Sequence, residues 1–119
     1  MSKTVLVVDD SRMSRMMIST IIKTHYPDWL IIDAASGDEA LQKVEGQSID
    51  LMTLDMNMPG MDGITLGTEL RAKYPDAAIA LVTANIQSAV QEKAEAAELE
   101  FIAKPITEDR IVNYIKSTE

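Results

Sequence analysis

The sequence contains no cysteine, and this absence excludes two kinds of structure. Disulfide bonds cannot form, and a metal site built from thiolates is ruled out. Basic residues are also few, since 11 lysines and arginines stand against 19 acidic residues and give a formal net charge of −8. A surface this acidic repels the phosphate backbone of nucleic acids, so we expect no direct nucleic-acid partner.

Long apolar stretches are absent as well. No run approaches the roughly 20 residues that a membrane-spanning helix needs, and no charged-then-apolar segment precedes Val5. We therefore expect no membrane partner and a cytoplasmic location. With 119 residues, no linker and no low-complexity segment, the chain is predicted to form one domain, residues 1–119. The eight methionines are expected to fill gaps in the core.

Five short apolar runs alternate with helical patterns along the chain, which is typical of strand–helix units around a parallel sheet. The predicted strands cover residues 4–8, 29–34, 49–54, 78–83 and 100–103. Within them, 5–8 and 79–82 are apolar without interruption, as expected for strands covered by helices on both faces. The pattern predicts an α/β fold with a doubly wound parallel sheet.

The helices between these strands have recognisable ends. The first should start near Ser11, and the first and third should stop at Tyr26 and Tyr74, because each tyrosine precedes a proline. Gly46 is expected to end the second helix, and Thr107 to cap the fifth. The predicted apolar faces are Met13, Met16, Met17, Thr20, Ile21 and Thr24 in the first helix, Ile86, Ala89, Val90, Ala94 and Ala97 in the fourth, and Ile111, Val112 and Ile115 in the fifth.

Charged residues stand where three of the predicted strands end. Asp9 and Asp10 follow the first strand, Asp55 follows the third, and Lys104 follows the fifth. Burying a charge without a partner is costly, so a carboxylate at the tip of an apolar strand indicates a metal, a cation or a chemical role. In a doubly wound sheet the active crevice lies beyond the carboxyl ends of the strands, where these side chains would meet.

The chemistry of this set points to phosphate. Several carboxylates close together repel one another, and one would be protonated unless a cation lies among them. Only oxygen ligands are at hand, with no His or Cys nearby, so the fitting cation is Mg²⁺. Acids, Mg²⁺, Lys104 and the hydroxyl of Thr83 suit phosphoryl transfer, in which a carboxylate can act as nucleophile and become an aspartyl phosphate.

These residues resemble the sequence marks of the response-regulator receiver family, over essentially the whole chain. The motifs are Asp9-Asp10, Asp55-x-x-Met58-Pro59-x-Met61-Asp62-Gly63, Thr83-Ala84 and Lys104-Pro105. Each motif alone is weak, whereas the four in this order are specific. The resemblance implies five parallel strands in the order 2-1-3-4-5, which is the flavodoxin-like (CheY-like) three-layer sandwich.

The resemblance also implies roles for the acidic residues. Asp55 would accept a phosphoryl group from a phosphohistidine on a partner, either a sensor histidine kinase or a phosphotransfer protein. Asp10, Asp55 and the backbone carbonyl of Asn57 would hold Mg²⁺, and Asp9 would act partly through water.

Three further residues would couple phosphorylation to output. Lys104 would pair with the phosphoryl oxygens, and its bond to Pro105 would be cis. Thr83 would turn its hydroxyl to the new phosphoryl group, and Phe101 would then rotate inward. This movement would repack the face formed by the fourth helix, the fifth strand and the fifth helix, where a downstream protein target would bind. The resemblance implies self-phosphorylation and slow self-dephosphorylation but no other enzymatic activity.

Two positions in and after the helices depart from the family's usual pattern. Ala96-Ala97-Glu98 stands where the family commonly has Ala-Gly-Ala, so the glycine that usually supplies a left-handed cap after the fourth helix is missing. Gly67 takes a position in the third helix that usually holds a large aliphatic residue. It should cost about 1 kcal/mol of helix propensity relative to alanine unless something packs closely against it.

The sequence leaves alternatives open. The leading hypothesis is a stand-alone phosphorylation switch, and a chemotaxis output protein, a phosphate sink or shuttle and the receiver part of a longer regulator are not distinguished. A Mg²⁺-dependent phosphohydrolase is less favoured, because such enzymes carry Asp-x-Asp after the first strand, whereas Asp9 and Asp10 are adjacent. A flavin-binding electron carrier is also disfavoured, since this acid pair would repel the cofactor phosphate. For Arg12 and Arg15, a surface role and a partner-docking role are equally compatible with the sequence.

Overall fold

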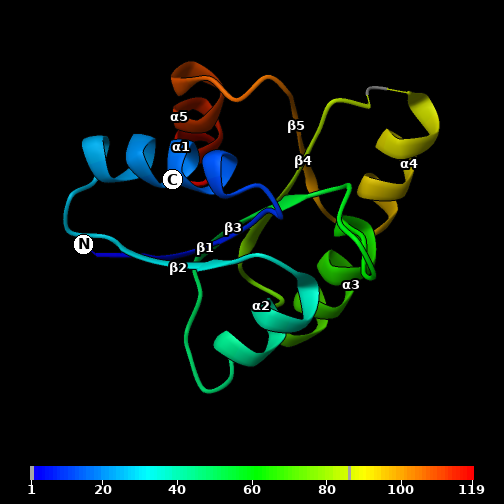
Figure 1. The fold of residues 1–119 in the computed structure, drawn as a ribbon, viewed down its shortest axis with the longest axis horizontal. Helices are drawn as coiled ribbons and strands as arrows, with labels where there is room; N and C mark the ends of the chain where they lie inside the picture. Colours follow the sequence, from blue (N-terminus) through cyan, green and yellow to red (C-terminus); the bar gives the residue numbers. More distant parts are fainter. Residues whose placement is uncertain (1, 86) are drawn as a thin grey trace.

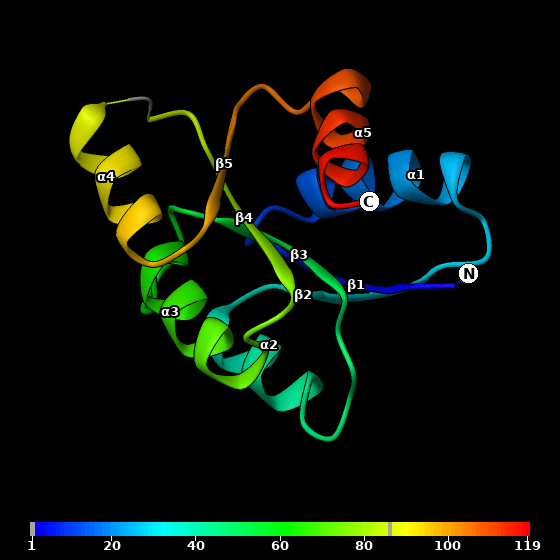
Figure 2. The same cartoon turned by 180° about the vertical axis from the view of Figure 1, so that it is seen from behind.

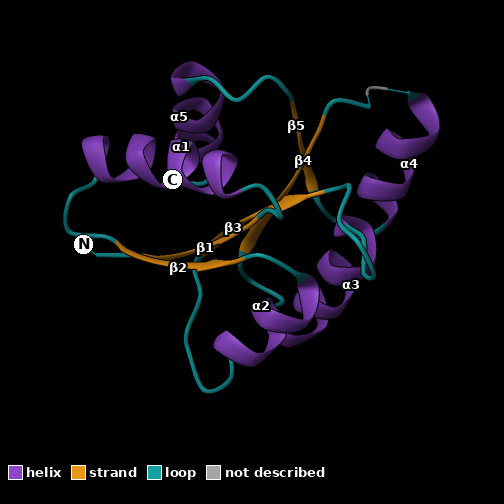
Figure 3. Cartoon of the chain, in the orientation of Figure 1, coloured by secondary structure: helices purple, strands orange, loops and turns teal. Residues whose placement is uncertain are grey.

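The structure is a computed structural model that describes residues 2–85 and 87–119. Five strands alternate with five helices among these residues (Figure 1, Figure 3). In chain order they are β1 (Thr4–Val8), α1 (Arg12–His25), β2 (Leu30–Ala34), α2 (Gly37–Lys43), β3 (Leu51–Asp55), α3 (Gly63–Lys73), β4 (Ala78–Thr83), α4 (Ser88–Ala96), β5 (Glu100–Ala103) and α5 (Glu108–Ser117). None of the helices in the described residues combines the length and apolar character of a membrane span.

The strands form one parallel sheet in the order β2-β1-β3-β4-β5, which confirms the predicted doubly wound topology. β1 and β3 are neighbours, with Val8 opposite Leu54, and Asp55 at the end of β3 lies opposite Val82 of β4. Because all strands run in the same direction, their carboxyl ends share one edge of the sheet.

Helices cover both faces of the sheet, as Figure 1 and the reverse view in Figure 2 show. α1 and α5 lie on one face, and α2, α3 and α4 lie on the other. Adjacent residues of β1 therefore belong to different cores: Val7 packs with Ile18 on the α1–α5 side, and Leu6 packs with Leu66 on the other. This two-sided burial explains the uninterrupted apolar runs in β1 and β4.

Most of the predicted helix ends are confirmed. The Ser11 hydroxyl accepts a hydrogen bond from the Ser14 amide at the start of α1, and Tyr26 and Tyr74 are the C-caps of α1 and α3. The prediction for α2 was wrong, because this helix ends at Lys43 and Gly46 lies in the turn beyond it with φ 73°. β2 and β3 begin slightly later than predicted, and β3 extends to include Asp55.

The buried face of α1 is not the predicted one. Met13, Met16 and Met17 are 73%, 58% and 43% exposed, whereas Ile18 and Ile22 are fully buried. Ile18 and Ile22 are one helical turn apart, so they form a second stripe at the same spacing as the methionine stripe. This stripe packs against the sheet and α5. The expectation that methionines fill the core was therefore wrong for these three residues.

The apolar faces of α4 and α5 match the predictions in part. Val90 and Ala94 of α4 are buried, whereas Ala89 is exposed and Ala97 is the helix C-cap; Ile86 lies outside the described residues.

In α5, Ile111 and Ile115 are buried as predicted, but Val112 is only half-buried. Tyr114 is buried in its place, and its hydroxyl donates a hydrogen bond to the Met52 carbonyl of β3 at 3.0 Å. A tyrosine can take a core position where its hydroxyl finds an acceptor, and β3 supplies one here.

The two departures from the family pattern are both accommodated between α3 and β5. Glu98 itself adopts the left-handed conformation that glycine usually takes, with φ 60°, and its carbonyl accepts a hydrogen bond from the Arg71 guanidinium at 2.7 Å. At Gly67, a Cβ would lie 2.7 Å from Cδ1 of Leu99. The missing side chain in α3 thus makes room for the leucine that follows Glu98.

Candidate functional site

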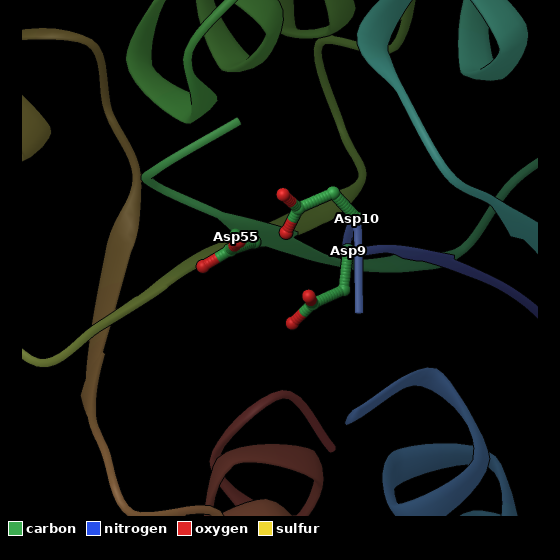
Figure 4. A group of neighbouring side chains, drawn as sticks. All are labelled: Asp9, Asp10 and Asp55. Atoms are coloured by element: carbon green, nitrogen blue, oxygen red, sulfur yellow. The ribbon is translucent and has the colours of Figure 1, made fainter. Parts of the chain in front are cut away.

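The three aspartates predicted to meet do so at the carboxyl edge of the sheet. Asp9 and Asp10 follow β1, and Asp55 ends the neighbouring strand β3; Figure 4 shows their side chains gathered at these two strand ends. One carboxylate oxygen from each residue lies within 4.8 Å of those of the other two. Asp9 and Asp55 are buried, and Asp10 is exposed.

Lys104 brings an ammonium group to this cluster from the end of β5. Its Nζ lies 3.0 Å from Oδ1 of Asp55 and 3.9 Å from Oδ2 of Asp9. The bond between Lys104 and Pro105 is cis, as expected. Among the described residues, this ammonium contacts two of the three carboxylates, so the cluster keeps an excess of negative charge.

Burial raises the pKa of both buried carboxyls above the ordinary aspartate value. For Asp55, desolvation is the largest cause, and the nearby Lys104 ammonium opposes it by lowering the pKa. For Asp9, desolvation again raises the pKa most; the hydrogen bond from the Ser11 amide lowers it, and the charge of Asp55 raises it further. Both carboxylates would be stabilised by an additional cation.

The residues present fit a hard divalent cation. Oδ2 of Asp9 is buried and accepts no hydrogen bond from the described residues, so it has an unused lone pair beside two other carboxylates. Three carboxylates within reach of one point form an oxygen donor set, which Mg²⁺ prefers. Asn57, the fourth predicted ligand, is exposed in the loop after β3.

The backbone around Asp9 is held by contacts that the sequence did not predict. The Asp9 amide donates to the Ala34 carbonyl of β2 at 3.1 Å, and its side chain accepts from the Ser11 amide at 2.9 Å. Its carbonyl accepts from the Arg15 guanidinium at 2.7 Å. Arg15 lies on the same stripe of α1 as Ile18 and Ile22. A charged residue on an otherwise apolar stripe is the sequence feature that indicates a buried partner for Arg15.

Thr83 lies at the end of β4, beside the cluster. It is fully buried, its hydroxyl accepts a hydrogen bond from the Asn85 amide at 3.0 Å, and its carbonyl accepts one from the Lys104 amide. Phe101 lies further down β5, opposite Leu81, and is half-buried against the α3–α4 core. The two predicted switch residues therefore lie on adjacent strands.

Asp62 and Gly63 have structural roles next to the site. The Asp62 carboxylate caps α3 by accepting a hydrogen bond from the Thr65 amide at 2.8 Å. Gly63 passes so close to β3 that a Cβ would lie 2.5 Å from the Asp55 carbonyl oxygen. Only glycine fits at this point without displacing the strand that carries the central carboxylate.

Comparison with known proteins agrees with this arrangement. The family model described as "Response regulator receiver domain" matches residues 5–116. The chain belongs to the response regulator receiver domain family. Receiver domains generally bind Mg²⁺ at an acidic pocket, and the Asp9-Asp10-Asp55 cluster is the acidic group of this receiver. As a receiver, the protein is a CheY-like component of two-component signalling.

Curated relatives of this receiver include chemotaxis proteins of similar length. The chemotaxis protein CheY of Bacillus subtilis is 35% identical over 119 residues, which cover 99% of this chain and 98% of that protein. CheY of Thermotoga maritima is 38% identical over 114 residues, covering 94% and 93%.

Solved structures share the fold of this receiver. The chemotaxis protein CheY4 of Vibrio cholerae superimposes with a TM-score of 0.92 over the whole of both chains at 24% identity. The chain in the CheX-CheY-BeF3-Mg+2 complex of Borrelia burgdorferi gives a TM-score of 0.88 at 29% identity, covering 97% of this receiver and 87% of that chain.

Proposed function

We propose that this receiver is a stand-alone response regulator that accepts a phosphoryl group on Asp55 and changes its protein contacts as a result. The observation that carries the proposal is the environment of the Asp55 carboxylate. Its buried carboxylate contacts Lys104 at 3.0 Å, and one of its oxygens lies within 4.8 Å of carboxylate oxygens of Asp9 and Asp10. A nucleophilic carboxylate beside groups that neutralise phosphoryl charge is the arrangement that acyl phosphate formation needs.

In the proposed reaction the donor is a phosphohistidine on a histidine kinase or a phosphotransfer protein. An Asp55 carboxylate oxygen forms a bond to phosphorus as the phosphorus–nitrogen bond breaks, and the electron pair of that bond stays on the imidazole, which takes a proton from water. Lys104 is placed to neutralise charge on the phosphoryl oxygens. Asp9, Asp10, Asp55 and the Asn57 carbonyl would hold Mg²⁺, which neutralises phosphoryl charge when bound.

We propose that the signal leaves the site through β4 and the edge strand β5. Thr83 would turn its hydroxyl to the phosphoryl group, and Phe101 would move inward. The register supports this coupling, since Thr83 pairs with Ala103 and Phe101 pairs with Leu81 on the same two strands. The face formed by α4, β5 and α5 would then bind a downstream protein, as the CheY of Borrelia burgdorferi is found in complex with CheX.

The relatives favour a chemotaxis role but also support a receiver within a longer regulator. A protein-glutamate methylesterase of Myxococcus xanthus is 37% identical over 102 residues that make up 29% of its own length. A phosphate sink or shuttle is a further variant of the same chemistry. A single domain over residues 1–119, a cytoplasmic location and the absence of a nucleic-acid partner stay predictions from the sequence.

The test is chemical phosphorylation of the purified protein. Incubation with Mg²⁺ and acetyl phosphate should add one phosphoryl group, which hydroxylamine removes because it cleaves acyl phosphates. Asp55→Asn should add none, whereas Asp76→Asn, a change at an exposed acid far from the cluster in the sequence, should behave as wild type. Equal phosphorylation of wild type and Asp55→Asn would refute the proposal.

The same experiment separates a switch from a phosphohydrolase. A switch takes up about one phosphoryl group per molecule and releases it slowly, whereas a hydrolase turns over a generic phosphate ester steadily. We propose that this receiver shows no such turnover. Sustained hydrolysis of p-nitrophenyl phosphate that Asp55→Asn abolishes would favour the hydrolase instead.

A further inference from the structure

Arg15 connects α1 to the end of β2 and to the acid cluster at the same time. Its Nε lies 3.1 Å from Oδ2 of Asp33, and its Nη1 donates to the Asp9 carbonyl at 2.7 Å. The Arg15 side chain is only 16% exposed, while that of Asp33 is 54% exposed. Asp33 is held in turn, because its own carbonyl accepts a hydrogen bond from Lys43 of α2 at 2.7 Å.

These contacts satisfy and orient both backbone polar groups of Asp9, its amide and its carbonyl. The Asp9 amide donates to Ala34, and the carbonyl receives Arg15, which Asp33 orients. Both contacts involve the last two residues of β2, Asp33 and Ala34. The Asp9 carbonyl belongs to the peptide plane that joins Asp9 to Asp10, so the direction of this hydrogen bond sets how the two adjacent carboxylates are presented.

We propose that Arg15 is a positioning residue for the divalent-cation site. It holds the peptide between Asp9 and Asp10 so that both carboxylates stay beside Asp55 although the three charges repel one another. The inference rests on the proposed Mg²⁺ site. Without the guanidinium, water would bond the Asp9 carbonyl, the peptide plane could rotate, and repulsion would move the carboxylates apart. The cation would then have to reassemble its ligands, which lowers its affinity.

This role and a simple charge effect predict opposite results. A positive charge close to a cation site opposes Mg²⁺ binding, so removing it should tighten binding if charge were all that mattered. If Arg15 positions the ligands, its removal should weaken binding. Arg12 provides the matched control, because it lies three residues earlier on α1, is exposed and forms no ion pair with the described residues.

The experiment is isothermal titration of the full chain with MgCl₂ at pH 7 and fixed ionic strength, with circular dichroism to check folding. For Arg15→Met we expect a Kd about 10-fold weaker than wild type, the lower end of the effect seen when groups that orient metal ligands are removed. Arg12→Met should bind equally well or more tightly. Arg15→Lys keeps the charge but presents one nitrogen where Arg15 uses two, so we expect a Kd about 3-fold weaker.

Each outcome decides a different point. If wild type takes up no Mg²⁺, the proposed function fails and the role of Arg15 falls with it. If wild type binds and folded Arg15→Met binds equally well or more tightly, the positioning role is wrong while the proposed function stands. Equal weakening by Arg12→Met and Arg15→Met would also overturn it. If Arg15→Met does not fold, Arg15→Lys decides, and a wild-type Kd for that variant would overturn the inference.

Discussion

At the scale of single residues, the distinctive feature of this receiver is an uncompensated excess of negative charge in the aspartate cluster. Asp9 and Asp55 are buried, Asp10 is next to them, and Lys104 offers one positive charge to the group. The free energy of unfolding is therefore lowered at neutral pH in the absence of a cation, because burial disfavours the charged form of both carboxyls and raises their pKa. The same excess charge would attract a divalent ion.

Replacing Asp55 with asparagine should stabilise the protein when no divalent cation is present. At pH 7 we expect the free energy of unfolding to rise by about 1 to 4 kcal/mol. This is the repulsion between two like charges about 4 Å apart, with the lower value for bulk water and the upper value for a site near a protein surface. The gain over wild type should shrink as the pH falls through the raised folded-state pKa of Asp55 towards its ordinary value of 3.8, because wild type then becomes protonated and regains stability. Urea unfolding at a series of pH values measures this difference.

The control for this series is Asp76→Asn, which removes the same charge from an exposed loop and should change stability by less than about 0.5 kcal/mol. Saturating Mg²⁺ should stabilise wild type more than Asp55→Asn, since the variant has lost one of the proposed ligands. A stability gain that does not vary with pH would contradict the charge explanation.

At the scale of elements, α1 carries two stripes of similar spacing, and only one of them is buried. Ile18 and Ile22 pack against the sheet, while Met13, Met16 and Met17 face away from the core. Isoleucine and methionine are both apolar, so hydrophobic periodicity alone cannot choose between the stripes. The sheet and α5 decide, because they lie on the side of Ile18 and Ile22.

Substitutions on the two stripes of α1 should differ sharply in their effect. Met16→Gln should change the free energy of unfolding by less than about 0.5 kcal/mol, as exposed substitutions usually do. Ile22→Ala should lower it by about 2 to 5 kcal/mol, through lost burial and the cavity left behind. Urea unfolding of both variants checks this assignment, and a loss of similar size for Met16→Gln would show that the methionine stripe is covered.

The contact between α3 and the start of β5 gives a prediction with an unusual sign. In an open helix, alanine in place of glycine gains about 1 kcal/mol. At Gly67 the new Cβ would lie 2.7 Å from Leu99 and 3.3 Å from Leu54, so overpacking of about 1 to 3 kcal/mol should make Gly67→Ala destabilising overall. In the Leu99→Ala background the same change should become stabilising, because the space has been emptied. A double-mutant cycle in urea measures the reversal, and its absence would mean that Leu99 moves aside freely.

At the scale of the whole molecule, the parallel sheet brings segments that are distant in the sequence to one edge. Asp9, Asp55, Thr83 and Lys104 come from four strand ends and meet at that edge. Phe101 lies on β5, the strand that Lys104 follows, and this position underlies the proposed coupling to the face formed by α4, β5 and α5.

The proposed switch can be followed through Phe101, because it is the only phenylalanine in the chain. With fluorinated phenylalanine, phosphorylation by acetyl phosphate should shift the single ¹⁹F signal in wild type and in Thr83→Ser, which keeps the hydroxyl. Thr83→Ala should still take up the phosphoryl group, as mass spectrometry would show, but its ¹⁹F signal should stay unchanged. Loss of phosphoryl uptake in Thr83→Ala would place Thr83 in the transfer step rather than in the switch.

The sequence by itself determined the alternation of strands and helices, the helix ends before Pro27 and Pro75, and the grouping of charged residues at strand ends. These features depend on local periodicity, backbone geometry and the cost of an unpaired buried charge, all of which act within a few residues. Only the tertiary structure decided which stripe of α1 is buried, that Tyr114 replaces Val112 in the core, and that Arg15 holds the Asp9 carbonyl. Each of these depends on a partner from a strand or helix distant in the chain, and local pattern carries no information on where that partner lies.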